Sequence, residues 1–224
     1  MPSVVPGFLP APRSLSASHQ LQLQGLEIGH GPWQLCQGWN HGWAPGLHLL
    51  QGGDGAGKSS LLRVLAGAEP PRAGQVLLAG QPLQAQDCFW MDPRQAQSAD
   101  QAQQLVKDWV GAQQSRYPRW QAAQWQAHVQ HWQLETALDK PWLALSTGTA
   151  RKLWMAAGLA SGAALVLIDE PIAGLDRPSV AYLHALLAQQ AGVQNRWVMV
   201  AHYDDLQGLP WNTQLVLESL PLSR

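Results

Sequence analysis

The chain has 224 residues, and its 14 basic and 15 acidic side chains give a formal net charge of −1. This balance provides no overall attraction to nucleic acid or to an anionic membrane surface. No apolar run approaches the roughly 18 residues of a membrane span, and two cysteines, Cys36 and Cys88, do not make a disulfide framework. We therefore expect a cytoplasmic chain whose thiols are inert.

In chain order, the first residues lack a basic segment, and prolines interrupt their apolar residues. This predicts a flexible arm over 1–20 and not a signal peptide. The segment HQLQLQGLEIG then alternates apolar and polar residues like a half-buried strand, and WQLCQGWNHGW alternates more raggedly. LHLLQ predicts a short strand directly before a glycine-rich loop, and SSLLRVLAG predicts a helix after it, ending at Gly67.

The second half of the chain alternates helices with apolar strands. After the turn–strand–turn PPRAGQVLLAGQPL, residues 98–144 shift to Gln, Ala and Trp at helical spacing. ARKLWMAAGLASG predicts a helix, ALVLIDE a buried strand, 179–190 a helix, RWVMVAH a buried strand and TQLVLESL a last short strand. Buried strands that alternate with helices predict an α/β fold with a mostly parallel sheet.

The glycine-rich loop is costly to order, because glycine loses more backbone entropy on folding than any other residue. Some function of the loop, such as ligand binding, must offset this cost. Its sequence GGDGAGKS fits G-x-x-x-x-G-K-[ST], the phosphate-binding loop. Backbone N–H groups converge on phosphate oxygens only where no Cβ intrudes, and the next helix adds its positive dipole end. A plain glycine-rich turn is the alternative, which the flanking strand and helix disfavour. We expect these nucleotide contacts: Gly52, Gly53, Asp54, Gly55, Ala56, Gly57, Lys58, Ser59 and Ser60.

Within this set Lys58 would reach the β- and γ-phosphates, and the Ser59 hydroxyl would hold Mg²⁺. A phosphate loop also needs a carboxylate at the end of a neighbouring strand. In ALVLIDEP, Asp169 ends the apolar run and would hold Mg²⁺ directly or through water. Glu170 follows and is placed to act as general base on the attacking water. A carboxylate pair that merely caps the strand is the alternative. We therefore expect ATP and Mg²⁺ as ligands.

These motifs occur in a chain that resembles an ATP-binding cassette (ABC) ATPase from residue 21 to 218. The segment LALSTGTARKLWMAAGLASGAALVLIDEPIAGLD is similar to the family's signature motif, helix, Walker B strand and D-loop in unbroken order. The resemblance implies a P-loop NTPase (RecA-like) core with an N-terminal antiparallel β subdomain. It also implies an inserted α-helical subdomain at about 96–150, within an ABC ATPase domain at 21–220.

The resemblance implies a head-to-tail dimer in which ATP lies between two copies. Ser146 and Gly148 of one copy would contact the γ-phosphate held by the other copy's loop, since a helix N-terminus makes a second anion site. Asp176 would belong to the D-loop that crosses the seam, and His202 matches the switch histidine that contacts the γ-phosphate and orders the water. The signature departs from the commonest form at two positions outside the phosphate contacts, Thr147 and Thr149.

Two further matches leave alternatives open. CFWMDPRQ stands where a strand ending in glutamine is usual, so Asp92 takes the Q-loop place and could hold Mg²⁺ or its water. Gln95, three residues later, is the rival. The aromatic that stacks on adenine is either His30, which aligns best, or Trp33. The sequence does not decide between the two candidates in either case.

The function implied is that of a nucleotide-binding subunit of an ABC transporter, an ATPase bound to the inner face of the cell membrane through a permease on a separate chain. The cassettes would form a homodimer or a heterodimer, and SRYPRWQ resembles export-type systems. The alternatives are a cassette ATPase acting on ribosomes or DNA and an unrelated P-loop kinase. One cassette, no heptad block and near-neutral charge disfavour the former, so no nucleic acid is expected. LSTG and His202 disfavour the kinase.

Tryptophans of the helical block have two interpretations. They could line a groove that receives the membrane subunit, or they could pack the small core of the helical block. We favour the core for most of this set: Trp109, Trp120, Trp125 and Trp132.

Overall fold

The computed structural model describes residues 20–30, 33–93 and 98–217 of the chain. Most of the expected N-terminal arm, and the end of the expected last strand, lie outside these residues. The described part is an α/β structure with two sheets of different type. The predicted fold class is confirmed by this architecture, in which one sheet is antiparallel and the other entirely parallel.

The antiparallel sheet has four strands in the order β2-β1-β4-β5. It consists of β1 (Leu21–His30), β2 (Trp33–Trp43), β4 (Ala73–Leu78) and β5 (Gln81–Pro82). Successive side chains of a strand point to opposite faces, and a register shift between Leu23 and Leu26 keeps both halves of β1 burying the same face. The buried apolar set comprises Leu21, Leu23, Leu26 and Ile28.

The parallel sheet has five strands in the order β6-β7-β8-β3-β9. They are β3 (Gly46–Gln51), β6 (Cys88–Phe89), β7 (Leu165–Asp169), β8 (Trp197–His202) and β9 (Thr213–Val216). Every residue of β7 and β8 is buried. Continuous apolar strands of this kind are typical of a parallel sheet covered on both faces.

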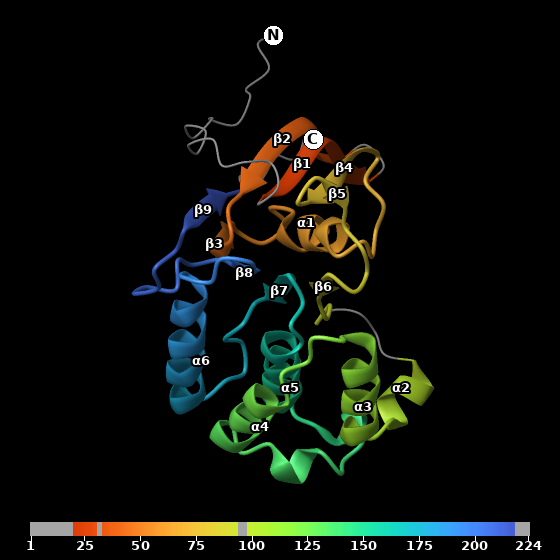
Figure 1. The fold of residues 1–224 in the computed structure, drawn as a ribbon, viewed down its shortest axis with the longest axis vertical. Helices are drawn as coiled ribbons and strands as arrows, with labels where there is room; N and C mark the ends of the chain where they lie inside the picture. Colours follow the sequence, from red (N-terminus) through yellow and green to blue (C-terminus); the bar gives the residue numbers. More distant parts are fainter. Residues whose placement is uncertain (1–19, 31–32, 94–97, 218–224) are drawn as a thin grey trace.

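The two faces of this sheet have different covers (Figure 1). Helix α1 (Lys58–Leu65) lies between the parallel and the antiparallel sheet, and the core there includes Trp197 and Met199 of β8. Helices α5 (Thr147–Ala160) and α6 (Arg177–Gln190) cover the opposite face. The alternate residue Val198 packs in this second core.

Between β6 and α5 the chain forms α2 (Ala99–Gln103), α3 (Val106–Arg116), α4 (Ala122–His131), η2 (Glu135–Ala137) and η3 (Trp142–Ala144). These helices lie at the end of the molecule remote from the antiparallel sheet (Figure 1). The tryptophans pack in a core, as preferred, but that core is shared with the parallel sheet and α6 and is not the helical block's own. Three are buried and the fourth packs against the cluster, namely Trp109, Trp125, Trp132 and Trp120. Among the described helices, none is long and apolar enough to cross a membrane.

Both cysteines are free thiols, Cys36 half-buried and Cys88 buried. Burial raises the pKa of Cys88 to about 12 and also raises the pKa of Cys36. Since the thiolate is the reactive form, both side chains are as inert as the sequence predicts.

Candidate functional site

The candidate site lies at the carboxyl ends of three adjacent strands. Gln51, Asp169 and His202 end β3, β7 and β8, which are neighbours in the order β7-β8-β3. The N–H of Gly52 donates to the carbonyl of His202 at 3.3 Å, so the glycine-rich loop starts beside the histidine that ends β8. Ligands of open α/β sheets bind at this edge of the sheet. The topology thus brings together three motifs that are far apart in the sequence.

The loop between β3 and α1 has a left-handed backbone at Gly55 (φ 75°) and Gly57 (φ 93°), which glycine adopts without steric cost. A Cβ on Gly57 would lie 2.5 Å from the Leu35 side chain, and one on Gly52 would lie 2.8 Å from the carbonyl of Leu217. The fold itself therefore requires these two glycines. Sequence reasoning credited them only with the approach of phosphate.

Lys58 begins α1, and its side chain folds back over the loop. Its ammonium donates to the carbonyls of Gly52 at 2.7 Å and Gly53 at 3.1 Å. It also lies 3.9 Å from the carboxylate of Glu170. Because a buried ammonium must be hydrogen-bonded, the loop's own carbonyls satisfy it in this state. The same charge lies between the loop carbonyls and Glu170.

Ser59 and Asp169 form a buried pair, with the serine hydroxyl donating to Oδ2 of Asp169 at 2.7 Å. The second carboxylate oxygen, Oδ1, is buried and has no hydrogen-bond partner within the described residues. An oxygen ligand set of hydroxyl and carboxylate suits Mg²⁺, which takes few protein ligands and relies on phosphate and water for the rest. The two residues therefore fit a Mg²⁺ ion in chemistry and in their unsatisfied bonding capacity.

Glu170 and His202 form a second pair beside this one. Nε2 of His202 lies 3.5 Å from Oε2 of Glu170, and Nδ1 of the same ring is 3.1 Å from both the N–H and the carbonyl of Asp204. The imidazole is buried. Its orientation is therefore set by Glu170 on one side and by the backbone of Asp204 on the other. Glu170 has a left-handed backbone, φ 50°, which is costly for a residue with a Cβ. Such strain clusters at functional sites.

The signature residues lie at the start of α5. Ser146 is exposed and caps the helix by accepting from the N–H of Thr149 at 3.1 Å. A Cβ on Gly148 would overlap the carbonyl oxygen of Gly174, in the turn that follows Glu170. Ser146 lines a cavity of about 430 Å³ whose lining residues all fall between 132 and 152. That cavity belongs to the helical block and not to the glycine-rich loop.

Asp176 caps α6, where it accepts from the N–H of Ser179 at 2.8 Å and pairs with Lys152 at 3.2 Å. These hydrogen bonds, from Ser179 first and then from Lys152, lower the pKa of Asp176 to about 2. The carboxylate is 61 % exposed. It therefore stays charged at neutral pH and is accessible to solvent.

The structure gives Asp92 an unforeseen partner. Its carboxylate accepts from Nε and Nη2 of Arg63 on α1, at 3.0 and 2.9 Å. Its role as a metal ligand remains a prediction. Gln95 and the side chains of His30 and Trp33 lie outside the described residues, so the Q-loop and adenine alternatives stay open.

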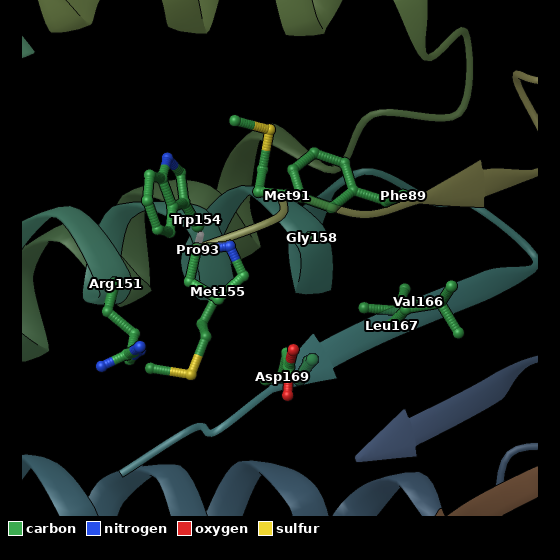
Figure 2. A pocket seen from close by; sticks show the side chains of 11 residues that line it. Phe89, Met91, Pro93, Arg151, Trp154, Met155, Gly158, Val166, Leu167 and Asp169 are labelled. Atoms are coloured by element: carbon green, nitrogen blue, oxygen red, sulfur yellow. The ribbon is translucent and has the colours of Figure 1, made fainter. Parts of the chain in front are cut away.

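Sequence reasoning also missed Arg151, which is buried on the inner face of α5. A signal for it exists: Arg151, Met155 and Gly158 recur at helical spacing, so a charged residue falls on a face that is otherwise apolar. They line one small cavity together with Asp169 (Figure 2).

A parallel sheet whose strand ends hold a phosphate loop, a Ser–Asp pair and a Glu–His pair defines a P-loop NTPase. The family model described as ABC transporter matches residues 44–173. The chain therefore belongs to the ABC transporter family, as one of its ATP-binding proteins, and these are ATPases that power transport. Members of the family dimerise and work with transmembrane subunits.

Individual relatives agree with this assignment. The chain is 30% identical to the cytochrome c biogenesis ATP-binding export protein CcmA of Pseudomonas putida (strain GB-1), over 69% of this chain and 75% of the relative. It is 29% identical to the protein of the same name from Pasteurella multocida (strain Pm70), over 85% and 92%. An ABC transporter ATP-binding protein from Pyrococcus furiosus shares the fold, with a TM-score of 0.70 at 19% identity over 88% of this chain and 97% of that one.

Proposed function

We propose that this chain hydrolyses ATP as one half of a head-to-tail dimer that drives a permease carried on a separate chain. The observation that supports the dimer is the position of Ser146. It is exposed at the start of α5 and lines a cavity of the helical block, while the phosphate loop extends from the parallel sheet. A second copy, turned head to tail, would bring its Ser146 and the buried backbone of its Gly148 to the phosphate loop.

When ATP binds, Lys58, Ser59 and Asp169 would replace contacts within the chain by contacts to the nucleotide and its metal ion. Lys58 would give up the carbonyls of Gly52 and Gly53 for phosphate oxygens, a stronger charge-assisted interaction. Ser59 and Asp169 would hold Mg²⁺, and that ion supplies charge neutralisation at the phosphates. Ser60 and the exposed loop residues Gly53, Asp54 and Gly55 would contribute further contacts.

Proton transfer falls to the second pair. Glu170 would accept the proton of the attacking water, because it follows the metal-binding aspartate and faces Lys58. His202 would keep that carboxylate and the water in line, since its Nε2 lies 3.5 Å from Glu170 and its Nδ1 is held by Asp204. Asp176, exposed at the start of α6, would meet the partner copy.

The direction of transport we propose is export, at the cytoplasmic face of the cell membrane. The support is that the two relatives described above are ATP-binding export proteins, together with the export-type resemblance of SRYPRWQ. ATP binding would close the dimer and hydrolysis would reopen it. The permease could be shifted only by the difference in affinity between these two states.

The test uses Glu170→Gln, which loses the base but keeps the shape of the side chain. We expect turnover to fall about 100- to 10,000-fold, while ATP binding persists and light scattering shows a dimer with ATP and a monomer without it. Lys58→Ala in the same background is the control and should not dimerise. Expressed in the native host, the trapped form should retain a multispanning membrane protein, identified by mass spectrometry. Parental turnover in Glu170→Gln, or recovery only with ribosomal or DNA-bound proteins, would contradict the proposal.

A further inference from the structure

Arg151 is a buried charge to which the sequence analysis gave no role, although it lies in the segment that resembles the signature motif and its helix. It lies on α5 five residues after Ser146, and only 8% of its surface is exposed. Burying a guanidinium is costly unless it is paired and hydrogen-bonded. An arginine in this position must therefore have compensating partners, and their identity indicates what the residue does.

The first partner is a backbone carbonyl beside the catalytic glutamate. Nη1 of Arg151 donates to the carbonyl of Ala173, in the turn that leads away from Glu170. Figure 2 shows the Arg151 side chain leaving α5 towards the segment that follows Asp169. Because Glu170 has a left-handed backbone, its carboxylate is aimed correctly only while this turn is held. Arg151 is one of the groups that hold it.

The carboxylates of Asp169 and Glu170 act on Arg151 through their charge, without a hydrogen bond or ion pair to it in the described part of the chain. Burial lowers the pKa of Arg151, and the negative charges of Asp169 and Glu170 oppose that shift. Nε of Arg151 and Oδ1 of Asp169 are both buried without a hydrogen-bond partner in the described part of the chain. They line the same cavity of about 20 Å³, which is large enough for one water. The arginine is therefore within electrostatic reach of the metal-binding and catalytic carboxylates.

We propose that Arg151 is a positioning residue for ATP hydrolysis. It fixes the turn after Glu170 through Ala173, and its charge offsets part of the negative charge of Asp169 and Glu170. Lys58 is the other cation near Glu170, at 3.9 Å, but the proposed mechanism moves it to phosphate. Arg151 then remains as a fixed cation behind the carboxylates within the described residues. This inference rests on the function proposed above.

The charge predicts two effects of opposite sign in Arg151→Gln. Turnover should fall about tenfold with the KM for ATP changed less than about twofold, because an orienting contact is lost and no phosphate contact is. The affinity for Mn²⁺ in the presence of ADP, measured by electron paramagnetic resonance, should rise about three- to tenfold, because a cation near the metal site is removed. A residue with a purely structural role would weaken both.

Arg196→Gln is the matched control. Arg196 is also shielded from solvent, and it donates to the carbonyls of Gly158 and Leu159 at the far end of the same helix, at 2.7 and 2.9 Å. Its loss should lower the urea midpoint and leave Mn²⁺ affinity unchanged. If Arg151→Gln does not fold, Arg151→Lys carries the test, with Mn²⁺ affinity near the parental value and a lower kcat.

The inference is overturned if Arg151→Gln matches the Arg196→Gln control in kcat and Mn²⁺ affinity, or if Arg151→Lys equals the parental protein in kcat. A parental protein that neither hydrolyses ATP nor binds Mn²⁺ with ADP would overturn the proposed function itself. If only the inference fails, the parental protein still hydrolyses ATP and binds Mn²⁺ with ADP, which distinguishes the two cases.

Discussion

The strand ends of the parallel sheet and the first turn of α5 both present groups suited to phosphate, but they differ in how those groups are satisfied. At the sheet, Lys58, Ser59 and Glu170 are engaged within the chain by carbonyls, a carboxylate and a histidine. At α5, Ser146 is exposed and bonded only locally, to Thr149. In the function we propose, the first region is a nearly assembled catalytic site and the second is a complementary surface, so two copies would be needed to join them.

Lys58→Ala should have the largest effect on the sheet region. Backbone N–H groups alone would then face the γ-phosphate charge, so we expect ATP turnover to fall about 100- to 1,000-fold. Nucleotide affinity, measured by calorimetry with ADP, should fall with it. Turnover at the parental rate would remove Lys58 from the site.

His202→Ala tests whether the second pair works as a unit. The imidazole is bonded to Asp204 and lies 3.5 Å from Glu170, so its loss should leave Glu170 poorly oriented. We expect kcat to fall about 10- to 100-fold, with nucleotide binding by calorimetry little changed. His202→Gln retains a hydrogen-bond donor and should recover part of the rate. Equal rates for both variants and the parental protein would contradict the pairing.

Gly148→Ala should damage the α5 region through packing. The added Cβ would overlap the carbonyl of Gly174, so the helix start and the turn must move apart. We expect the free energy of unfolding to fall by about 1–3 kcal/mol, measured by urea denaturation. Gly111→Ala, where a Cβ meets no atom within 4 Å, is the control and should not destabilise. Equal stability of the two variants would show that the close approach is not needed.

Asp176→Asn should have the smallest effect. The pKa of Asp176 is lowered to about 2 by its bonds to Ser179 and Lys152, so its stabilising contribution is present above the unfolded-state pKa of about 3.9 and is lost as pH falls towards 2. Asparagine keeps the helix cap but cannot titrate. The urea midpoints of the two proteins should therefore differ slightly at pH 7 and converge near pH 2. A difference independent of pH would exclude the charge as the cause.

The catalytic motifs are predictable from the residues because each is tied to the end of an element that the apolar pattern already specifies. Asp169 follows an unbroken apolar run, and His202 ends another, so parallel pairing alone brings them together. The phosphate loop is predictable for the same reason. Its glycines, however, serve packing against Leu35 and Leu217 as well, which no local pattern reveals.

The contacts that escaped prediction are those that depend on how helices pack. Arg63 and Asp92 are 29 residues apart and meet only because α1 lies beside the segment after β6. In the sequence, Arg151 looks like an ordinary basic residue of a helix. Only the packing of α5 on β7 shows that its side chain is buried and lines a cavity with Asp169. The direction of a side chain and the partner it reaches are tertiary properties.

A mixing experiment tests the head-to-tail arrangement most directly. Lys58→Ala disables the phosphate loop, and Ser146→Arg blocks the signature surface, so each protein alone should be inactive. In an equal mixture only the mixed dimers have an intact site, one of their two. We expect the mixture to regain ATPase activity that neither protein has alone, at about a quarter of the parental rate where the copies pair at random. A mixture as inactive as its components would contradict the composite site.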